Sequence, residues 1–166
     1  KAGFVRLAAG GFDLIETMGF DPEEGIAHLE LHLERMKASA EELGFAFDRH
    51  AARNAIQALC FELDKPAKLR LLLARSGATT LETGPMPPAH TGALRCALVP
   101  MPTVTGDWRL RHKSTDRAFY EMALDLAKEA GAGEALLLRD DGLVTEGSFT
   151  NIFVEKGGRL ITPPLE

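Results

Sequence analysis

The chain has 166 residues, a formal net charge of −5 at pH 7 and a hydrophobic fraction of 45%, values typical of a soluble globular protein. This length accommodates one ordinary domain or two small ones. The acidic balance argues against binding to nucleic acid or to an acidic membrane surface. No apolar run approaches the ~20 residues that a membrane helix needs. We therefore expect a cytoplasmic protein with no nucleic-acid partner and no membrane contact.

Two helices are predicted in the first half of the chain. Apolar residues between positions 28 and 43 recur at spacings of three and four, which is the period of a helix with one buried stripe. On the same helix His32 and Arg35 lie one turn apart, beside that stripe. Asp48 stands where an N-cap would begin a second helix, which we expect to run over residues 49–63.

Strands and turns dominate the rest of the chain. Residues 68–75 and 78–83 are predicted to form a hairpin, and the proline-rich segment 84–92 is predicted to be a linker. Beyond it we expect further strands, which are 94–101, 108–113, 134–140, 143–148, 150–156 and 159–164.

A third helix is predicted from residue 116 to about residue 130, and its expected buried face consists of Phe119, Met122, Ala123 and Leu126. The first half of the chain is thus rich in helix and the second half in strand. This order favours an α+β fold in two small lobes, 1–86 and 87–166.

A basic cluster lies just before this third helix, in the segment WRLRHK at 108–113. If the segment is extended, its period of two places Arg109, Arg111 and Lys113 on one face. Like charge nearby, together with burial, would lower the pKa of Lys113 and favour the neutral amine, which attacks carbonyl groups. The alternative is a solvated basic strand end.

Two further residues are candidates for chemistry. Glu146 precedes Gly147 and Ser148 between two apolar strand segments, where the backbone can approach a ligand closely; the alternative is an exposed glutamate at a strand end. Arg35 carries a planar fork that suits a phosphate group. Its alternative is an arginine at the solvent edge of an amphipathic helix.

Four segments together resemble the class IV aminotransferases, which are fold-type IV enzymes that use pyridoxal phosphate. The resemblance runs from about Phe12 to Pro164, and the last two of its segments are the specific ones. The segments are FDLIETM, HLERMKASAEELGF, HKSTDRAFY and TEGSFTNIFVEKGGRLITPP. The resemblance implies the two-lobed fold of the D-amino acid aminotransferases.

The resemblance also implies roles for individual residues. Lys113 is expected to bind pyridoxal 5'-phosphate covalently and to shuttle the proton. Glu146 is expected to meet the pyridine nitrogen and keep it protonated, so that the ring is a strong electron sink. Arg35 is expected to contact the phosphate, and Asn151, with Thr150, to line the cofactor pocket.

Within the family, the opening segments most resemble its lyase-like members. They imply a 4-amino-4-deoxychorismate lyase, which makes 4-aminobenzoate and pyruvate for folate synthesis from a small-molecule amino substrate. Arg109, Arg111 and Arg117 are hypothesised to bind substrate carboxylates. One alternative is an aminotransferase for branched-chain or D-amino acids. Another is a non-catalytic binding module that retains the fold.

Three remaining expectations concern assembly, length and metals. The family implies a homodimer. Its members continue beyond the strand that ends in TPP, so we expect this chain to be truncated at the C-terminus. Cys60 and Cys96 lie in apolar surroundings without the spacing of a zinc or redox motif, so we expect buried free thiols and no metal site.

Overall fold

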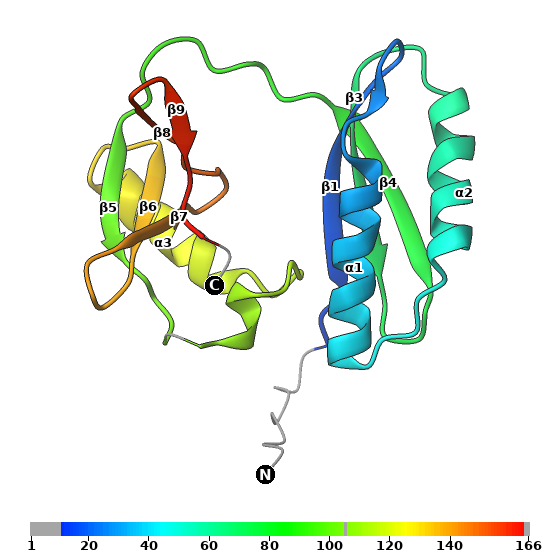
Figure 1. Cartoon of the computed structure of the whole chain (residues 1–166), viewed down its shortest axis with the longest axis horizontal. Helices are drawn as coiled ribbons and strands as arrows, with labels where there is room; N and C mark the ends of the chain where they lie inside the picture. Colours follow the sequence, from blue (N-terminus) through cyan, green and yellow to red (C-terminus); the bar gives the residue numbers. More distant parts are fainter. Residues whose placement is uncertain (1–10, 105, 165–166) are drawn as a thin grey trace. The chain divides into compact units, whose positions relative to one another are not determined.

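The computed structural model describes residues 11–104 and 106–164, and the chain divides into two units (Figure 1). The first unit contains the residues up to Pro88 together with Arg109–Asp116, and the second contains 89–108 and the residues from Arg117 onward. We had expected Arg109–Asp116 in the second lobe. Among the described residues, no helix has both the length and the apolar character that crossing a membrane requires.

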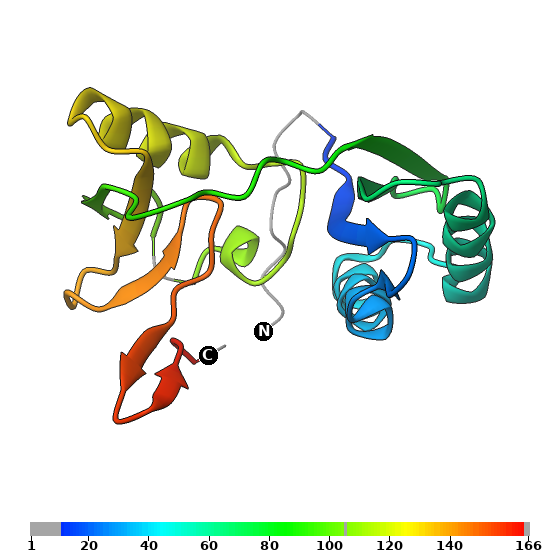
Figure 2. The same ribbon diagram turned by 90° about the horizontal axis from the view of Figure 1, so that it is seen from above.

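The first unit is an antiparallel sheet with two helices on one face (Figure 2). Its strand order is β2-β1-β3-β4. The bounds of its elements are β1 Leu14–Asp21, β2 Gly25–Ile26, α1 Leu29–Leu43, α2 Arg49–Phe61, β3 Ala67–Leu73 and β4 Thr79–Pro85. The predictions of both helices and of the β3–β4 hairpin are confirmed.

Alternation along the strands builds the core of this unit. Every second residue of β3 is buried, so that Leu69, Leu71 and Leu73 face the helices with 0% exposure. Leu33 of α1 and Ile56 of α2 pack against them, also at 0% exposure. The predicted N-cap of α2 forms as well, because the Asp48 carboxylate accepts a hydrogen bond from the Ala51 amide at 2.9 Å.

The second unit contains a mixed three-stranded sheet and a separate hairpin. Strand β5 runs parallel to β6, helix α3 packs against both, and β7 pairs with β6 antiparallel. The bounds are β5 Cys96–Pro100, the 3₁₀ turn η1 Trp108–Leu110, α3 Ala118–Glu129, β6 Glu134–Leu138, β7 Val144–Gly147, β8 Val154–Lys156 and β9 Arg159–Ile161. The α+β fold is therefore confirmed.

The buried face of α3 differs from the expected one. Met122 and Leu126 are 56% and 48% exposed, whereas Tyr120 and Ala127 are 8% and 0% exposed. The helix is rotated because alanines at 123 and 127 allow a close approach to the sheet and because the Tyr120 hydroxyl has a carboxylate partner. Apolar spacing alone permits either face.

Two smaller expectations were wrong. The strand expected from residue 150 begins only at Val154, since residue 150 lies in a bend and residues 151–153 have no regular structure. Both cysteines are free, but Cys96 is exposed and Cys60 is only partly buried. Cys96 lies on β5, which is an edge strand of its sheet, and its side chain is on the outward side of the alternation.

Leu69→Ala tests the core of the first unit. Deleting a fully buried leucine removes apolar contacts and leaves a cavity, so we expect the free energy of unfolding to fall by about 2–5 kcal/mol. Chemical denaturation followed by circular dichroism measures the change. Leu31→Ala is the matched control, because Leu31 is 67% exposed and should change the free energy by less than about 0.5 kcal/mol.

Candidate active site

Arg35 is held by a buried carboxylate that the sequence analysis did not single out. Glu16 lies on the helix-facing side of β1 and is 1% exposed. Its Oε1 accepts from Arg35 Nε at 2.7 Å and its Oε2 from Arg35 Nη2 at 2.5 Å, a bidentate pair. His32 Nδ1 lies 2.8 Å from the same Oε2. His32 and Arg35, one turn apart on α1, thus both contact the same acidic residue of the sheet.

The charge balance of this cluster favours the ionised forms. Burial alone would raise the pKa of Glu16, but the hydrogen bonds from Arg35 and His32 outweigh it and hold the pKa below its ordinary value of 4.5. The hydrogen bond to Glu16 in turn raises the pKa of Arg35. The pair with Glu16 uses Nε and Nη2, so the donors of Nη1 take no part in it, and the Arg35 side chain is 50% exposed.

Residues 108–113 do not form the expected strand. Trp108–Leu110 is a 3₁₀ turn, and the two arginines of the segment contact different partners. Arg109 Nη1 lies 3.4 Å from Asp116 Oδ1, and Arg111 Nη2 lies 2.9 Å from Glu42 Oε1. The single face of Arg109, Arg111 and Lys113 is therefore absent.

Between these arginines and Lys113, His112 anchors the segment to α1. It is buried, and its Nδ1 lies 3.0 Å from Ser39 Oγ. Ser39 lies on α1 one turn after Arg35, and its contact with His112 explains why a serine there is buried. The contact ties residues 73 positions apart in the sequence.

Lys113 is half-buried and lies beside β1. Its carbonyl oxygen accepts a hydrogen bond from the Ile15 amide at 3.0 Å, and the Thr115 amide donates to Asp13 O at 2.9 Å. Glu16, the partner of Arg35, is the next residue of the same strand. Strand β1 therefore positions both Lys113 and Arg35, which were predicted from motifs far apart in the sequence.

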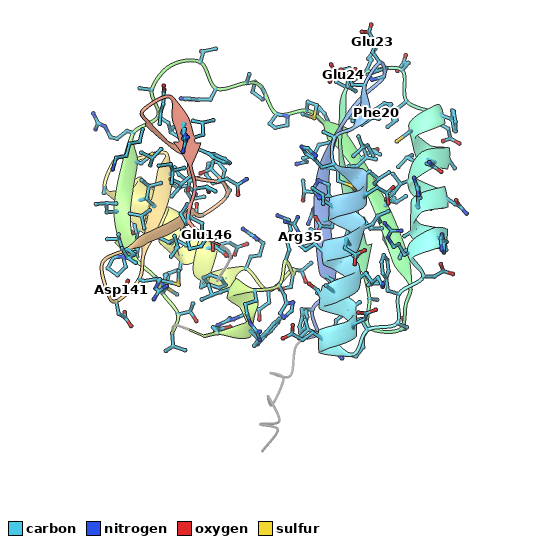
Figure 3. All side chains as sticks on the ribbon, in the orientation of Figure 1. Phe20, Glu23, Glu24, Arg35, Asp141 and Glu146 are labelled. Carbon is cyan, nitrogen blue, oxygen red and sulfur yellow. The ribbon has the colours of Figure 1, made fainter. Side chains whose placement is uncertain are left out.

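Glu146 stands on β7 in the second unit, where it is half-buried (Figure 3). The Tyr120 hydroxyl of α3 donates a hydrogen bond to its Oε1 at 2.7 Å. Burial, together with the carboxylate, raises the pKa of Tyr120 well above its usual range. The tyrosine therefore stays protonated and serves as a hydrogen-bond donor to Glu146.

Arg117 connects the start of α3 to the turn after β7. Its Nη2 donates to the Ser148 carbonyl oxygen at 3.0 Å, and its guanidinium carbon lies 4.3 Å from the centroid of the Tyr120 ring. This geometry is that of a cation–π contact. Arg117 thus supports the surroundings of Glu146, and its proposed contact with substrate stays a prediction.

A second buried carboxylate shapes the turn that follows Glu146. Glu134, 1% exposed, accepts hydrogen bonds from the Ser148 amide at 2.9 Å, from the Ser148 hydroxyl and from Thr150 Oγ1 at 2.8 Å. Within the turn, a Cβ on Gly147 would lie 2.2 Å from Thr150 Oγ1. The turn therefore requires glycine at 147, and Asn151 follows it as an exposed residue.

The predicted residues thus fall into two groups. Arg35, Lys113, Arg109 and Arg111 belong to the first unit, whereas Glu146, Asn151 and Arg117 belong to the second. Sequence reasoning missed the residues that support them, which are Glu16, Tyr120 and Glu134. The signal that points to Glu16 is an acidic residue on the buried face of the alternating strand β1. Glu134 lies on the less buried face of β6 and carries no such signal.

Comparison with known proteins finds similarity over nearly the same residues as the resemblance seen in the sequence. A family model described as amino-transferase class IV matches residues 13–166. A Schizosaccharomyces pombe protein assigned as an aminodeoxychorismate lyase is 30% identical in an alignment of 162 residues, which covers 93% of this chain and 67% of that protein.

Two solved structures extend the likeness to three dimensions. A protein of Mesorhizobium loti assigned as an amino-acid aminotransferase superposes with a TM-score of 0.79 at 32% identity, over 93% of this chain and 75% of that one. A protein assigned as a 4-amino-4-deoxychorismate lyase superposes with a TM-score of 0.77 at 26% identity, over 94% of this chain and 68% of that one. The fold-type IV architecture expected from the sequence is confirmed.

Glu16→Gln tests the buried ion pair. The amide keeps the shape but loses the charge that Arg35 and His32 satisfy, so we expect the free energy of unfolding at pH 7 to fall by about 1–3 kcal/mol. The folded-state pKa of Glu16 is depressed below 4.5. Its contribution is therefore present above that pH and is lost as the pH falls through the folded-state value.

The difference in stability between the wild type and Glu16→Gln should accordingly shrink on acidification, as measured by urea denaturation across a pH series. A difference that does not change with pH would contradict the ionised pair. Glu82→Gln is the control, because Glu82 pairs with Arg70 on the surface at 3.0 Å and both side chains are exposed.

Proposed function

Because the chain belongs to the class IV aminotransferases, we propose that it acts as a pyridoxal phosphate-dependent 4-amino-4-deoxychorismate lyase, giving 4-aminobenzoate and pyruvate. The observation that carries the proposal is its 30% identity, over 93% of its length, to the fission yeast protein assigned to this activity. The family makes the chain a pyridoxal phosphate enzyme and weighs against the non-catalytic module. We further propose a cytoplasmic homodimer.

Each of the three proposed ligands carries a group of the kind that the cofactor requires. Arg35 is oriented by Glu16 through Nε and Nη2, and its side chain is 50% exposed, so a charged donor is left for a phosphate. Glu146 has one oxygen taken by Tyr120 and a second oxygen for a pyridine N–H. Lys113 supplies the primary amine. We propose these three residues as the cofactor ligands, together with Asn151.

The bound cofactor supplies an electron sink conjugated to the substrate amine. In the proposed mechanism, Lys113 would hold the cofactor through Nζ, and once the substrate amine has taken its place that Nζ would accept the proton from the carbon that bears the substrate nitrogen. Glu146 would keep the pyridine nitrogen protonated. Cleavage of the bond between the ring carbon and the enolpyruvyl oxygen, with protonation of the released enol, would give pyruvate and leave an aromatic ring, and Lys113 would then hold the cofactor again.

The substrate carries carboxylates, and we propose that Arg109, Arg111 and Arg117 contribute to their binding. Each guanidinium already contacts a group of the protein, namely Asp116, Glu42 or Ser148 O. Of the two arginines that pair with Asp116 and Glu42, Arg111 has the more exposed side chain, 62% against 25% for Arg109. It is therefore the strongest candidate to share its donors with a substrate.

Transamination is the second candidate function, because the Mesorhizobium loti protein assigned as an amino-acid aminotransferase is 32% identical. The two reactions need the same lysine, glutamate and arginine but differ in their second substrate. A lyase releases pyruvate and 4-aminobenzoate without a 2-oxo acid. An aminotransferase for branched-chain or D-amino acids needs a 2-oxo acid acceptor.

Lys113→Ala tests the proposed chemistry. We expect the wild-type holoenzyme to show the visible absorbance of a lysine-bound cofactor, to lose it on borohydride treatment, and to release pyruvate from aminodeoxychorismate without an acceptor. The variant should lose the lysine-dependent band and more than about a hundredfold in rate. Lys128→Ala, in the last turn of α3, is the control. Product formation that requires a 2-oxo acid would overturn the lyase.

Arg35→Gln tests the phosphate contact by comparing two ligands on the same variant. Loss of charge-assisted hydrogen bonds should raise the Kd for pyridoxal phosphate about ten- to a hundredfold. The Kd for pyridoxal, which lacks the phosphate, should change by no more than about threefold. Fluorescence titration measures both constants. Arg53→Gln, which breaks a surface pair with Glu30, should leave both unchanged, and equal weakening of both ligands by Arg35→Gln would contradict the assignment.

A further inference from the structure

Tyr120 is the one tyrosine of the chain, and nothing in the motifs assigned it a role. It is 8% exposed, and its hydroxyl reaches across from α3 to donate to Glu146 Oε1 at 2.7 Å. We propose that Tyr120 is a positioning residue, which holds the Glu146 carboxylate through Oε1 so that Oε2 is presented to the pyridine nitrogen of the cofactor. This inference rests on the proposed cofactor-binding role of Glu146.

The tyrosine is itself fixed from two sides. The Arg117 guanidinium lies over the ring at 4.3 Å and also donates to the Ser148 carbonyl at 3.0 Å, two residues beyond Glu146. The Phe119 ring lies 4.0 Å from the Tyr120 ring, centroid to centroid. Helix α3 and the turn after β7 are thus linked through one aromatic ring. A carboxylate held in this way has little freedom to turn away.

The same contacts explain why a phenol suits the position. A hydrogen bond donated to a carboxylate favours the charged form, which is the form that keeps a proton on a pyridine nitrogen. Burial and the carboxylate raise the pKa of Tyr120. The phenol therefore stays a hydrogen-bond donor to Glu146 and adds no second negative charge beside it.

Tyr120→Phe tests the inference, because it keeps the ring and its contact with Arg117 and removes only the hydroxyl. We expect the Kd for pyridoxal phosphate to rise roughly three- to tenfold, as for the loss of one hydrogen bond. With cofactor labelled with ¹⁵N at the pyridine nitrogen, the NMR signal should move from the protonated toward the unprotonated position. A merely structural role would not move this signal.

Thr145→Val is the matched control. It also removes a hydroxyl from β7, one residue from Glu146, but that hydroxyl donates to Leu137 O at 3.2 Å. We expect it to leave both the ¹⁵N signal and the Kd unchanged. Equal effects of Thr145→Val and Tyr120→Phe would overturn the specific role of Tyr120.

Glu146→Gln separates this inference from the proposed function. We expect it to shift the ¹⁵N signal more than Tyr120→Phe does, and we expect the double variant to be no worse than Glu146→Gln alone, since Tyr120 acts through Glu146. If Glu146→Gln leaves the signal and the Kd unchanged, the cofactor-binding role of Glu146 fails. If Glu146→Gln changes both and Tyr120→Phe changes neither, only the role of Tyr120 fails.

A second measurement holds even if Tyr120→Phe folds poorly. Growth on 3-fluorotyrosine labels this position alone, because the chain has one tyrosine. We expect the single ¹⁹F signal to shift when pyridoxal phosphate binds, and we expect this shift to be lost in Glu146→Gln. A ¹⁹F signal that ignores cofactor binding in the wild type would contradict the inference.

Discussion

The buried carboxylate of Glu16 is the constraint around which the first unit is arranged. A charge in the interior is stable only with matched partners, and here Arg35 and His32 supply them from α1. Arg35 and His32 must therefore both face β1, and this requirement sets the rotation of α1 about its axis. In that rotation, the apolar stripe that contains Leu33 and Met36 faces the core. The ion pair thus holds α1 against β1 and also orients the half-exposed side chain of Arg35.

Local patterns predicted most of this fold. The two helices of the first unit and the β3–β4 hairpin follow from apolar periodicity and from turn residues, which act over a few positions. Residues 108–113 were predicted wrongly because distant partners decide their conformation. Arg111 contacts Glu42 and His112 contacts Ser39, about 70 positions away, and these contacts outweigh an alternating pattern only six residues long.

The candidate site shows the same division. Its proposed ligands, Lys113, Glu146 and Arg35, were found because they stand in recognisable segments. Their supports were not, because Tyr120 resembles one more apolar residue of a helix, and because the hydrogen-bond partners of Glu16 and Glu134 come from other segments of the chain. A polar residue can be buried where other elements supply its hydrogen-bond partners. Sequence periodicity describes one element at a time and therefore does not reveal those partners.

The edge of β1 has a consequence for the order of synthesis. Residues 13–15 pair with 113–115, so one side of a strand made early on the ribosome remains open until about a hundred further residues have been added. Unpaired strand edges invite association with other chains. During translation of the linker, this part of the β1 edge therefore stays unpaired and open to association with other chains. It becomes paired once the segment around Lys113 has been made.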